Sequence, residues 1–100
     1  MKKEELRDYL LFHCHGRERS KSGRQLERTL RTSKNELCKK VNCLRREGVP
    51  IASDRSGYFY AATAGEVYTT IQGLKKMRAG LDAAIAGLEG TLDTFPGLGR

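Results

Sequence analysis

Four polar side chains in the middle of the chain have the types and the spacing for reading DNA bases. They are Asn35, Lys39, Asn42 and Arg46. Steps of four, three and four residues place them on one side of an α-helix, since each residue turns the helix by ~100°. Leu37, Val41 and Leu44 fall on the opposite side. The major groove of DNA admits such a helix, and there asparagine pairs with adenine and lysine or arginine with guanine. We therefore predict base contacts by Asn35, Lys39 and Asn42.

Basic side chains around these positions suit contacts to the DNA backbone, which set position and orientation rather than sequence preference. The predicted phosphate contacts are Arg24, Arg28, Arg31, Ser33, Lys34, Lys40, Arg45 and Arg46. Ser33 belongs to this set because the N-terminus of a helix binds anions through its free N–H groups.

The positive charge of the chain is concentrated in the same region. The 100 residues carry a net charge of +7. Residues 1–62 contain 15 Lys+Arg and 8 Asp+Glu, which gives +7, whereas residues 63–100 contain 4 of each. Residues 17–46 contain 11 basic and 3 acidic residues, which gives +8. Neutralisation of phosphates requires such a basic footprint. A basic surface kept for solubility is the alternative.

The sequence patterns for metal binding and for catalysis are weaker than those for DNA binding. The candidate zinc ligands are His13, Cys14, His15, Cys38 and Cys43. They include no C-x-x-C spacing, and an adjacent H-C-H run cannot aim three side chains at one ion without distortion. We find no Gly-rich phosphate loop, nucleophile elbow or HExxH sequence. We therefore expect no metal, no cofactor and no enzymatic activity. Cys14 is predicted in the core or at its boundary, and Cys38 is a candidate oxidation sensor.

Capping signals define the helices that position these side chains. Ser22 begins an S-x-x-Q pattern, and Ser33 and Thr63 begin S/T-x-x-E patterns. In such a capping box the hydroxyl accepts from the amide three residues on, and the Gln or Glu reaches back. Together with the apolar periodicity, these signals predict helices over about 3–14, 23–30, 34–46 and 64–92, with a charged loop over 16–23. Gly48 ends the third helix. Residues 49–52 and 58–61 are predicted strands around a turn at 53–57 that carries Arg55.

The segment from residue 6 to residue 62 resembles a known family. The strings are S-G-x-Q-L-x-x-T-L, then T-S-K-N-E-L-x-x-x-V-x-x-L-R-R-E-G-V, then S-G-Y-F-Y. They are similar to the winged helix-turn-helix DNA-binding domain of the biotin repressor and of related small regulators of bacteria and phages. The resemblance implies an α+β winged fold, with residues 34–46 as recognition helix and the Arg55 loop as wing. The chain departs from it after Ala62, and no segment resembles a biotin-ligase catalytic domain.

The pattern of the last helix indicates a partner helix. Apolar residues alternate spacings of four and three, interrupted once by Arg78. They are Val67, Ile71, Leu74, Leu81, Ile85, Leu88 and Leu92. The dipeptide Gly-Leu recurs every seven residues, at 73–74, 80–81 and 87–88. A heptad seam flanked by small residues lets another helix approach and supercoil. We expect a homodimer through this helix, parallel or antiparallel. A helix that folds back on its own domain, broken at Gly80 or Gly87, is the alternative.

Length and composition limit the remaining classes. One hundred residues make one domain, organised as a winged part (1–62), a dimerisation helix (63–93) and a flexible tail (94–100). No apolar run approaches the ~20 residues of a membrane span, and the start carries no secretion pattern. We therefore expect a cytoplasmic protein with reduced cysteines. The predicted function is sequence-specific binding of duplex DNA as a transcriptional regulator. The alternatives are a small adaptor or inhibitor that binds a protein partner, and an accessory DNA-binding factor in replication or recombination.

Overall fold

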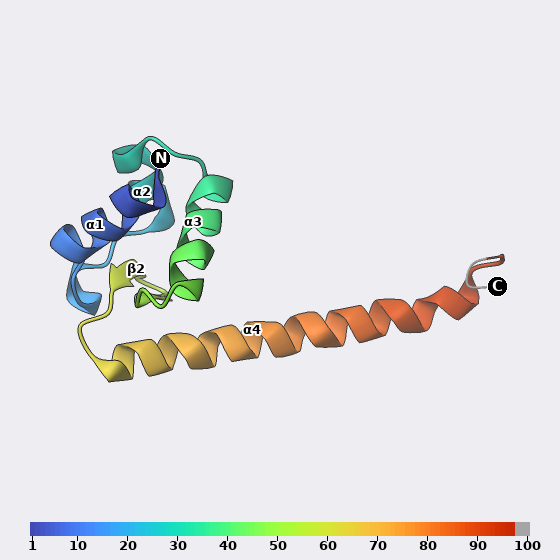
Figure 1. Cartoon of the computed structure of the whole chain (residues 1–100). Helices are drawn as coiled ribbons and strands as arrows, with labels where there is room; N and C mark the ends of the chain where they lie inside the picture. The colour runs from blue at the N-terminus through green and yellow to red at the C-terminus, as the bar shows by residue number, and fades with distance from the viewer. Residues whose placement is uncertain (98–100) are drawn as a thin grey trace. The chain divides into compact units, whose positions relative to one another are not determined.

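The computed structural model describes residues 1–97 and combines helices with one small sheet (Figure 1). Within these residues the order is α1, α2, α3, β1, β2 and α4. The bounds are α1 Lys3–His13, α2 Gly23–Leu30, α3 Lys34–Arg46, β1 Ile51–Asp54, β2 Gly57–Tyr60 and α4 Ala64–Thr91, with short 3-10 helices at Arg17–Arg19 and Leu92–Thr94. The predicted α+β class is confirmed. The chain forms two compact units, Met1–Thr70 and Ile71–Arg100. The predicted tail extends to residues 98–100, which lie outside the described part.

Two of the three predicted capping boxes are complete. Ser22 Oγ accepts from the Gln25 N–H at 3.2 Å, while Gln25 Oε1 accepts from the Ser22 N–H at 2.9 Å. The same reciprocal pair joins Thr63 to Glu66 at the start of α4. The box at Ser33 is half formed, because the Ser33 hydroxyl accepts from the Glu36 N–H whereas the Glu36 carboxylate lies 4.0 Å from Lys40 Nζ.

The end of α3 is closed by the glycine that the sequence indicates. Gly48 has φ +88°, a left-handed conformation that glycine adopts without steric cost. Its N–H donates to Arg45 O at 3.0 Å, and the Val49 N–H donates to Leu44 O at 3.0 Å. This pair of bonds is a Schellman motif, which satisfies the last carbonyls of the helix.

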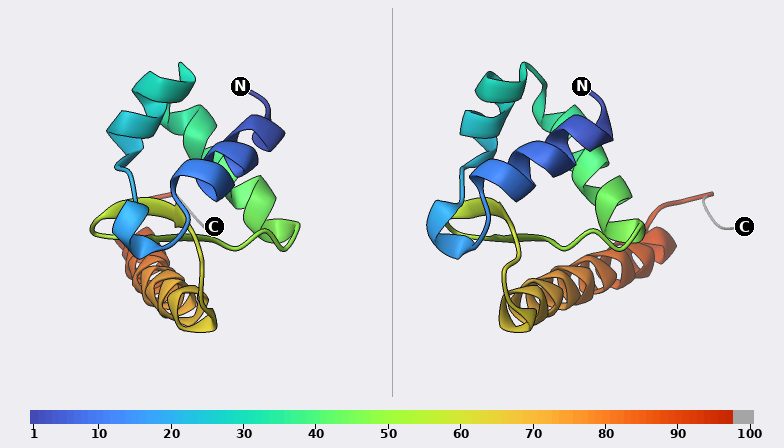
Figure 2. Two further views of the ribbon diagram at one scale, coloured as in Figure 1. Left: turned by 90° about the vertical axis from the view of Figure 1, so that its left-hand side faces the viewer. Right: turned by 60° about the vertical axis from the view of Figure 1, so that its left-hand side comes forward.

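Leucines from three helices form the core of the first unit. Leu6 and Leu10 of α1, Leu26 of α2 and Leu37 of α3 are fully or almost fully buried, and Phe59 of β2 joins them. Helix α1 packs on α3 and on β2, and α2 packs on α3, as the views in Figure 2 show. The apolar side of α3 is thereby fixed against the core, so its opposite side faces solvent.

The two strands lie closer to the tip of the hairpin than the sequence predicts. They pair antiparallel from Ile51 opposite Tyr60 to Asp54 opposite Gly57. The predicted strands at 49–52 and 58–61 and the five-residue turn were therefore wrong in their limits. The Val49 N–H is used by the end of α3 and Pro50 has none, so pairing starts later. At the tip, the Asp54 carboxylate accepts from the Ser56 N–H at 2.7 Å and closes a tight turn.

The predicted loop over residues 16–23 pairs with the other edge of β2. Lys21 and Tyr58 exchange two backbone hydrogen bonds of 3.1 and 2.8 Å. The Gly16 N–H donates to Tyr60 O at 2.8 Å, and the Tyr60 N–H donates to Cys14 O at 2.8 Å. Strand β2 is thus bonded on both edges. The close approach requires glycine at 57, because a Cβ there would lie 2.2 Å from Lys21 O.

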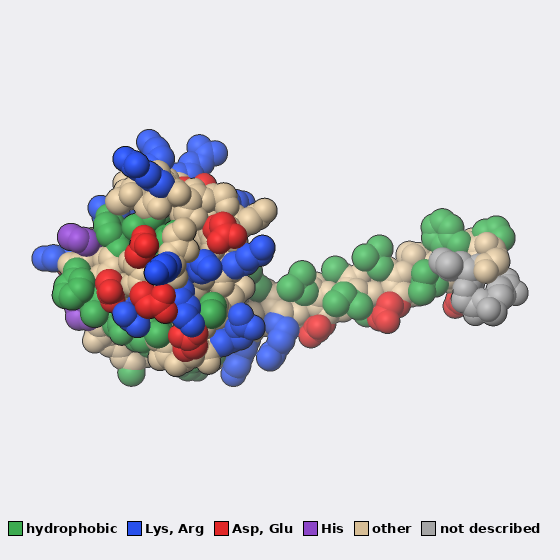
Figure 3. Space-filling model, turned by 45° about the horizontal axis from the view of Figure 1, so that its top comes forward, with side chains coloured by type: hydrophobic (Ala, Val, Ile, Leu, Met, Phe, Trp, Pro, Cys, Tyr) green, Lys and Arg blue, Asp and Glu red, His purple; other side chains and the backbone are tan. Residues whose placement is uncertain are grey.

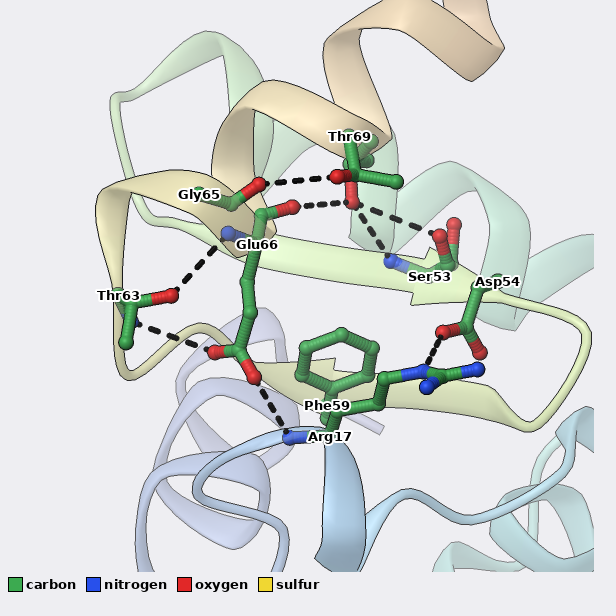
Figure 4. Close-up of a pocket in the computed structure, with 9 residues that line it drawn as sticks. Arg17, Ser53, Asp54, Phe59, Thr63, Gly65, Glu66 and Thr69 are labelled. Carbon is green, nitrogen blue, oxygen red and sulfur yellow. Dashed lines mark hydrogen bonds and ion pairs between the residues drawn. The ribbon is translucent and has the colours of Figure 1, made fainter.

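A carboxylate joins this loop to the start of α4 (Figure 4). Glu66 accepts N–H groups from Ala62 at 2.7 Å, Arg17 at 3.0 Å and Thr63 at 3.3 Å. These hydrogen bonds favour the ionised form and hold the pKa of the Glu66 carboxyl below its ordinary value. The first turn of α4 therefore belongs structurally to the first unit.

The second turn of α4 is held by a buried threonine. Thr70 is 8% exposed, and its hydroxyl accepts from the Ser53 N–H at 3.2 Å and lies 3.1 Å from Glu66 O, to which it can donate. One turn earlier, Val67 is half-buried against the core of the first unit. Val67 therefore starts the apolar repeat of α4 but packs within its own chain.

The second unit contains the rest of α4. The helix is continuous through Gly73, Gly80 and Gly87, where an added Cβ would meet nothing within 4 Å. Its large apolar side chains are exposed; Leu81 and Leu88 are 64% and 69% exposed. Across residues 1–97, no helix combines the length and apolar character needed to cross a membrane.

Candidate nucleic-acid interface

Helix α3 presents its polar side chains to solvent on one side. Asn35, Lys39, Asn42 and Arg46 are all exposed. The apolar residues of the same helix, Leu37, Val41 and Leu44, are buried. Amide and ammonium or guanidinium groups therefore share one surface of a helix that the core holds rigidly. Such a surface has the donors and acceptors that major-groove base edges require. Contact of these residues with DNA stays a prediction.

The turn between α2 and α3 contains a strained residue. Arg31 has φ +52° and ψ +53°, and it is the one non-glycine residue with positive φ in the described chain. The left-handed conformation costs a residue with a Cβ roughly 1–2 kcal/mol. Glycine would avoid this cost. The position nevertheless carries an exposed guanidinium.

Most of the predicted phosphate contacts are exposed cations of α2, of this turn and of α3. The exposed members are Arg24, Arg28, Arg31, Lys34 and Arg46. Lys40 is half-buried and lies 4.0 Å from Glu36 Oε2, so its charge is partly offset within α3. Ser33 is exposed, and its hydroxyl already accepts from the Glu36 N–H at 3.2 Å. The Ser33 O–H can still donate to an anion. Figure 3 shows groups of Lys and Arg side chains on the visible surface of the first unit.

Arg45 differs from the other predicted phosphate contacts. Its Nε donates to Ile51 O at 2.8 Å and its Nη2 donates to Ser53 Oγ at 3.0 Å. The guanidinium is half-buried between α3 and β1, and burial lowers the pKa of Arg45. These contacts assign Arg45 to the attachment of the hairpin rather than to the exposed basic surface. Its neighbour Arg46 has no such partner among the side chains of residues 1–97.

The hairpin carries the predicted wing residue at its tip. Arg55 is exposed in the turn between β1 and β2. Next to it, Asp54 forms an ion pair with Arg17 and accepts from Ser56. These hydrogen bonds and the guanidinium hold the pKa of the Asp54 carboxyl below its ordinary value. The sequence analysis missed Arg17, since the pairing joins residues 37 positions apart.

Two of the hollows beside these elements differ in what they offer a ligand. The one in Figure 4 is lined by Arg17, Asp54 and Glu66, whose charged groups already bond to one another or to the backbone. It serves as a structural junction. The other lies between α2 and α3, where Arg24, Lys34 and Cys38 line it together with Tyr58. Burial raises the pKa of the Tyr58 phenol, which therefore stays neutral. This second hollow adds polar donors to the basic surface.

The histidines and cysteines are separated by the fold. The His13 ring is tilted against the Tyr9 ring with centroids 4.8 Å apart, and the His15 ring centroid lies 5.9 Å from that of Tyr60. Cys14 is fully buried, as expected for a core position, and burial raises the pKa of its thiol. Cys43 lies 3.4 Å from Glu47 Oε2. Among residues 1–97, no three His, Cys, Asp or Glu side chains gather in a group that could hold a metal ion.

Comparison with family models, with curated proteins and with solved structures found no match for this chain. The geometry and charge of its own side chains are therefore the basis for assigning a function.

Proposed function

We propose that the first unit is a winged helix-turn-helix domain that binds duplex DNA sequence-specifically as a transcriptional regulator. Helix α3 is the recognition helix and enters the major groove. Asn35, Lys39 and Asn42 reach base edges, and the hairpin with Arg55 contacts the adjacent backbone or minor groove. The order of helices, the turn at Arg31 and the hairpin after α3 support this assignment.

One observation carries the proposal: most of the exposed cations of α2, the turn and α3 form no salt bridge among residues 1–97. Six exposed cations take part in none of the salt bridges found among residues 1–97. They are Arg24, Arg28, Arg31, Lys34, Lys39 and Arg46. Unpaired like charges on one small surface repel each other, and this repulsion destabilises the free protein. A polyanion relieves it, because each neutralised phosphate also releases condensed counterions.

Selection from random duplexes in ~0.15 M salt tests the proposal. We expect a defined motif from the intact chain. Asn35→Ala with Lys39→Ala relaxes the base preference, because it removes base contacts. Arg28→Ala weakens binding to every duplex, because it removes one phosphate contact. It also reduces the magnitude of the slope of log K against log salt concentration by about 0.9. Lys76→Ala is the matched control, since it removes one exposed cation from the second unit. Enrichment of no motif by the intact chain would refute sequence-specific recognition.

A protein-binding adaptor is the competing function, and the exposed apolar side chains of α4 favour it. The adaptor function and DNA recognition predict different outcomes in one experiment. A protein partner would stay bound after nuclease treatment and after charge reversal at Lys39 and Arg46. DNA binding would be lost under the same two treatments.

A further inference from the structure

The second unit carries an apolar seam that its own elements do not cover. Its described part consists of α4 and the short 3-10 turn after it. The seam residues of α4 in this part are Ile71, Leu74, Leu81, Ile85 and Leu88, and all are exposed. Leu92, the last residue of the predicted seam, lies in the 3-10 turn and is exposed as well. Alternate spacings of three and four residues are those of a coiled coil. Isoleucine at one seam position and leucine at the other favours two strands in parallel coiled coils.

The charges along this helix decide between the two orientations of such a pair. In the second unit Lys75, Lys76 and Arg78 lie in the first half, whereas the acidic residues lie further along. Glu66, at the start of α4, belongs to the first unit. The acidic residues of the second unit are Asp82, Glu89 and Asp93. Figure 3 shows basic side chains followed by acidic ones along this part of the helix. A parallel pair would align like charges and bring two copies of Arg78 face to face in the seam. An antiparallel pair opposes basic and acidic halves, which is attractive.

We propose that α4 pairs antiparallel with α4 of a second copy of this chain, with the centre of the pair between Ala79 and Gly80. In this register Ile71 faces Leu88 of the second copy, Leu74 faces Ile85, and Arg78 faces Leu81. The two-fold axis repeats each contact, so six layers form over ~25 Å of helix. Lys75 and Arg78 of each chain lie beside Asp82 of the other.

The neighbouring registers are disfavoured by their charges. A shift by one heptad toward the C-terminus places Asp82 against its own copy on the two-fold axis. A shift by one heptad in the other direction places Lys75 against its own copy. The second shift also requires Val67 in the seam, although Val67 packs on the core of the first unit. The register centred at Ala79 and Gly80 avoids both repulsions.

Two full-length variants test the orientation, and neither experiment needs DNA. The acidic variant carries Lys75→Glu, Lys76→Glu and Arg78→Glu. The swapped variant adds Asp82→Lys, Glu89→Lys and Asp93→Lys, so that its two halves are again complementary. Self-association is measured by sedimentation equilibrium from about 5 to about 500 µM chain in about 50 mM salt, where charge pairs are weakly screened. Circular dichroism verifies that each variant keeps its helix content.

We expect the unaltered chain to dimerise and the acidic variant to dimerise at least about tenfold more weakly, because four attractive contacts become repulsive. The swapped variant recovers the original dissociation constant within about threefold. In a mixture, unaltered and swapped chains pair with themselves, since an antiparallel mixed pair opposes like charges. A preference for mixed pairs indicates parallel helices and overturns the proposal, as does an acidic variant that dimerises normally.

The inference is independent of the proposed function. A chain that stays monomeric at every concentration but selects a DNA motif refutes antiparallel pairing and leaves DNA recognition intact. A chain that pairs as expected but selects no motif refutes sequence-specific DNA recognition and leaves antiparallel pairing intact.

Discussion

Replacement of Arg31 by glycine separates the conformational cost of the turn from the use of its charge. The left-handed backbone at this residue costs roughly 1–2 kcal/mol with a Cβ present. Glycine removes this cost but gains unfolded-state freedom worth roughly 0.4–1 kcal/mol. The midpoints of the two ranges differ by about 0.8 kcal/mol, so we expect Arg31→Gly to stabilise the fold by about 0.5–1 kcal/mol. For a domain of this size the melting temperature rises by about 2–8 °C.

The same substitution weakens the proposed interaction with DNA. Removal of one phosphate contact lowers the slope of log K against log salt by about 0.9, whatever the sequence of the duplex. Arg31→Gln is the matched control. It removes the charge and keeps a Cβ in the left-handed conformation, so we expect the same loss of slope without the gain in melting temperature.

Thermal unfolding and fluorescence anisotropy of a labelled duplex, titrated in about 50 to 200 mM salt, measure both effects. If Arg31→Gly does not melt at a higher temperature than Arg31→Gln, the left-handed backbone at this position carries no such cost. The functional argument fails if neither variant changes the salt slope, because Arg31 then contacts no phosphate. The two results are independent, so each argument can fail alone.

Three further predictions concern neighbouring parts of the chain. Arg45→Ala lowers the free energy of unfolding by about 1–3 kcal/mol, because Ile51 O loses its donor, whereas Arg46→Ala changes it by less than about 0.5 kcal/mol; urea unfolding compares them. Glu66→Gln lowers the melting temperature at pH 7. The difference in melting temperature from the unaltered chain narrows as the pH falls through the lowered pKa of Glu66, because the ionised carboxylate stabilises the fold above the unfolded pKa and this stabilisation is lost on protonation. Melting curves from pH 7 to about 3 test this. Gly80→Ala increases helix content, as alanine is favoured by about 1 kcal/mol, and leaves self-association intact; weaker self-association would place Gly80 in the contact.

Local signals predicted the helices, whereas distant pairings did not follow from the sequence. The hydroxyls of Ser22 and Thr63 act on amides three residues away, so a short pattern defines each helix start. The pairing of Lys21 with Tyr58 joins residues far apart in the chain and leaves no periodic trace. The start of β1 was misplaced for a related reason. The Val49 N–H could donate either within the hairpin or to the end of α3, and in the structure it donates to Leu44 O of α3.

The roles of single side chains within the candidate site were harder to predict than its location. Arg45 and Arg46 are adjacent and chemically identical, yet only the first is placed to reach Ile51 O. Val67 is the first residue of the apolar repeat of α4 but packs on the core of the first unit. In both cases the sequence gives the chemistry of the side chain, and the position of a distant strand decides how it is used.

The orientation of the paired helices bears directly on what a dimer would read. In the antiparallel register, Ile71 of one chain lies opposite Leu88 of the other, so the two copies of Ile71 are ~25 Å apart along the pair. The first units therefore attach at opposite ends of the paired segment, whereas a parallel pair would attach them at the same end. Opposite attachment favours two half-sites separated by a helical turn of DNA or more, related by a two-fold axis. We expect duplex selection to return such inverted half-sites with the unaltered chain and a single half-site with the acidic variant, whose first unit is unchanged. Paired half-sites selected by the acidic variant would show that α4 does not set their spacing.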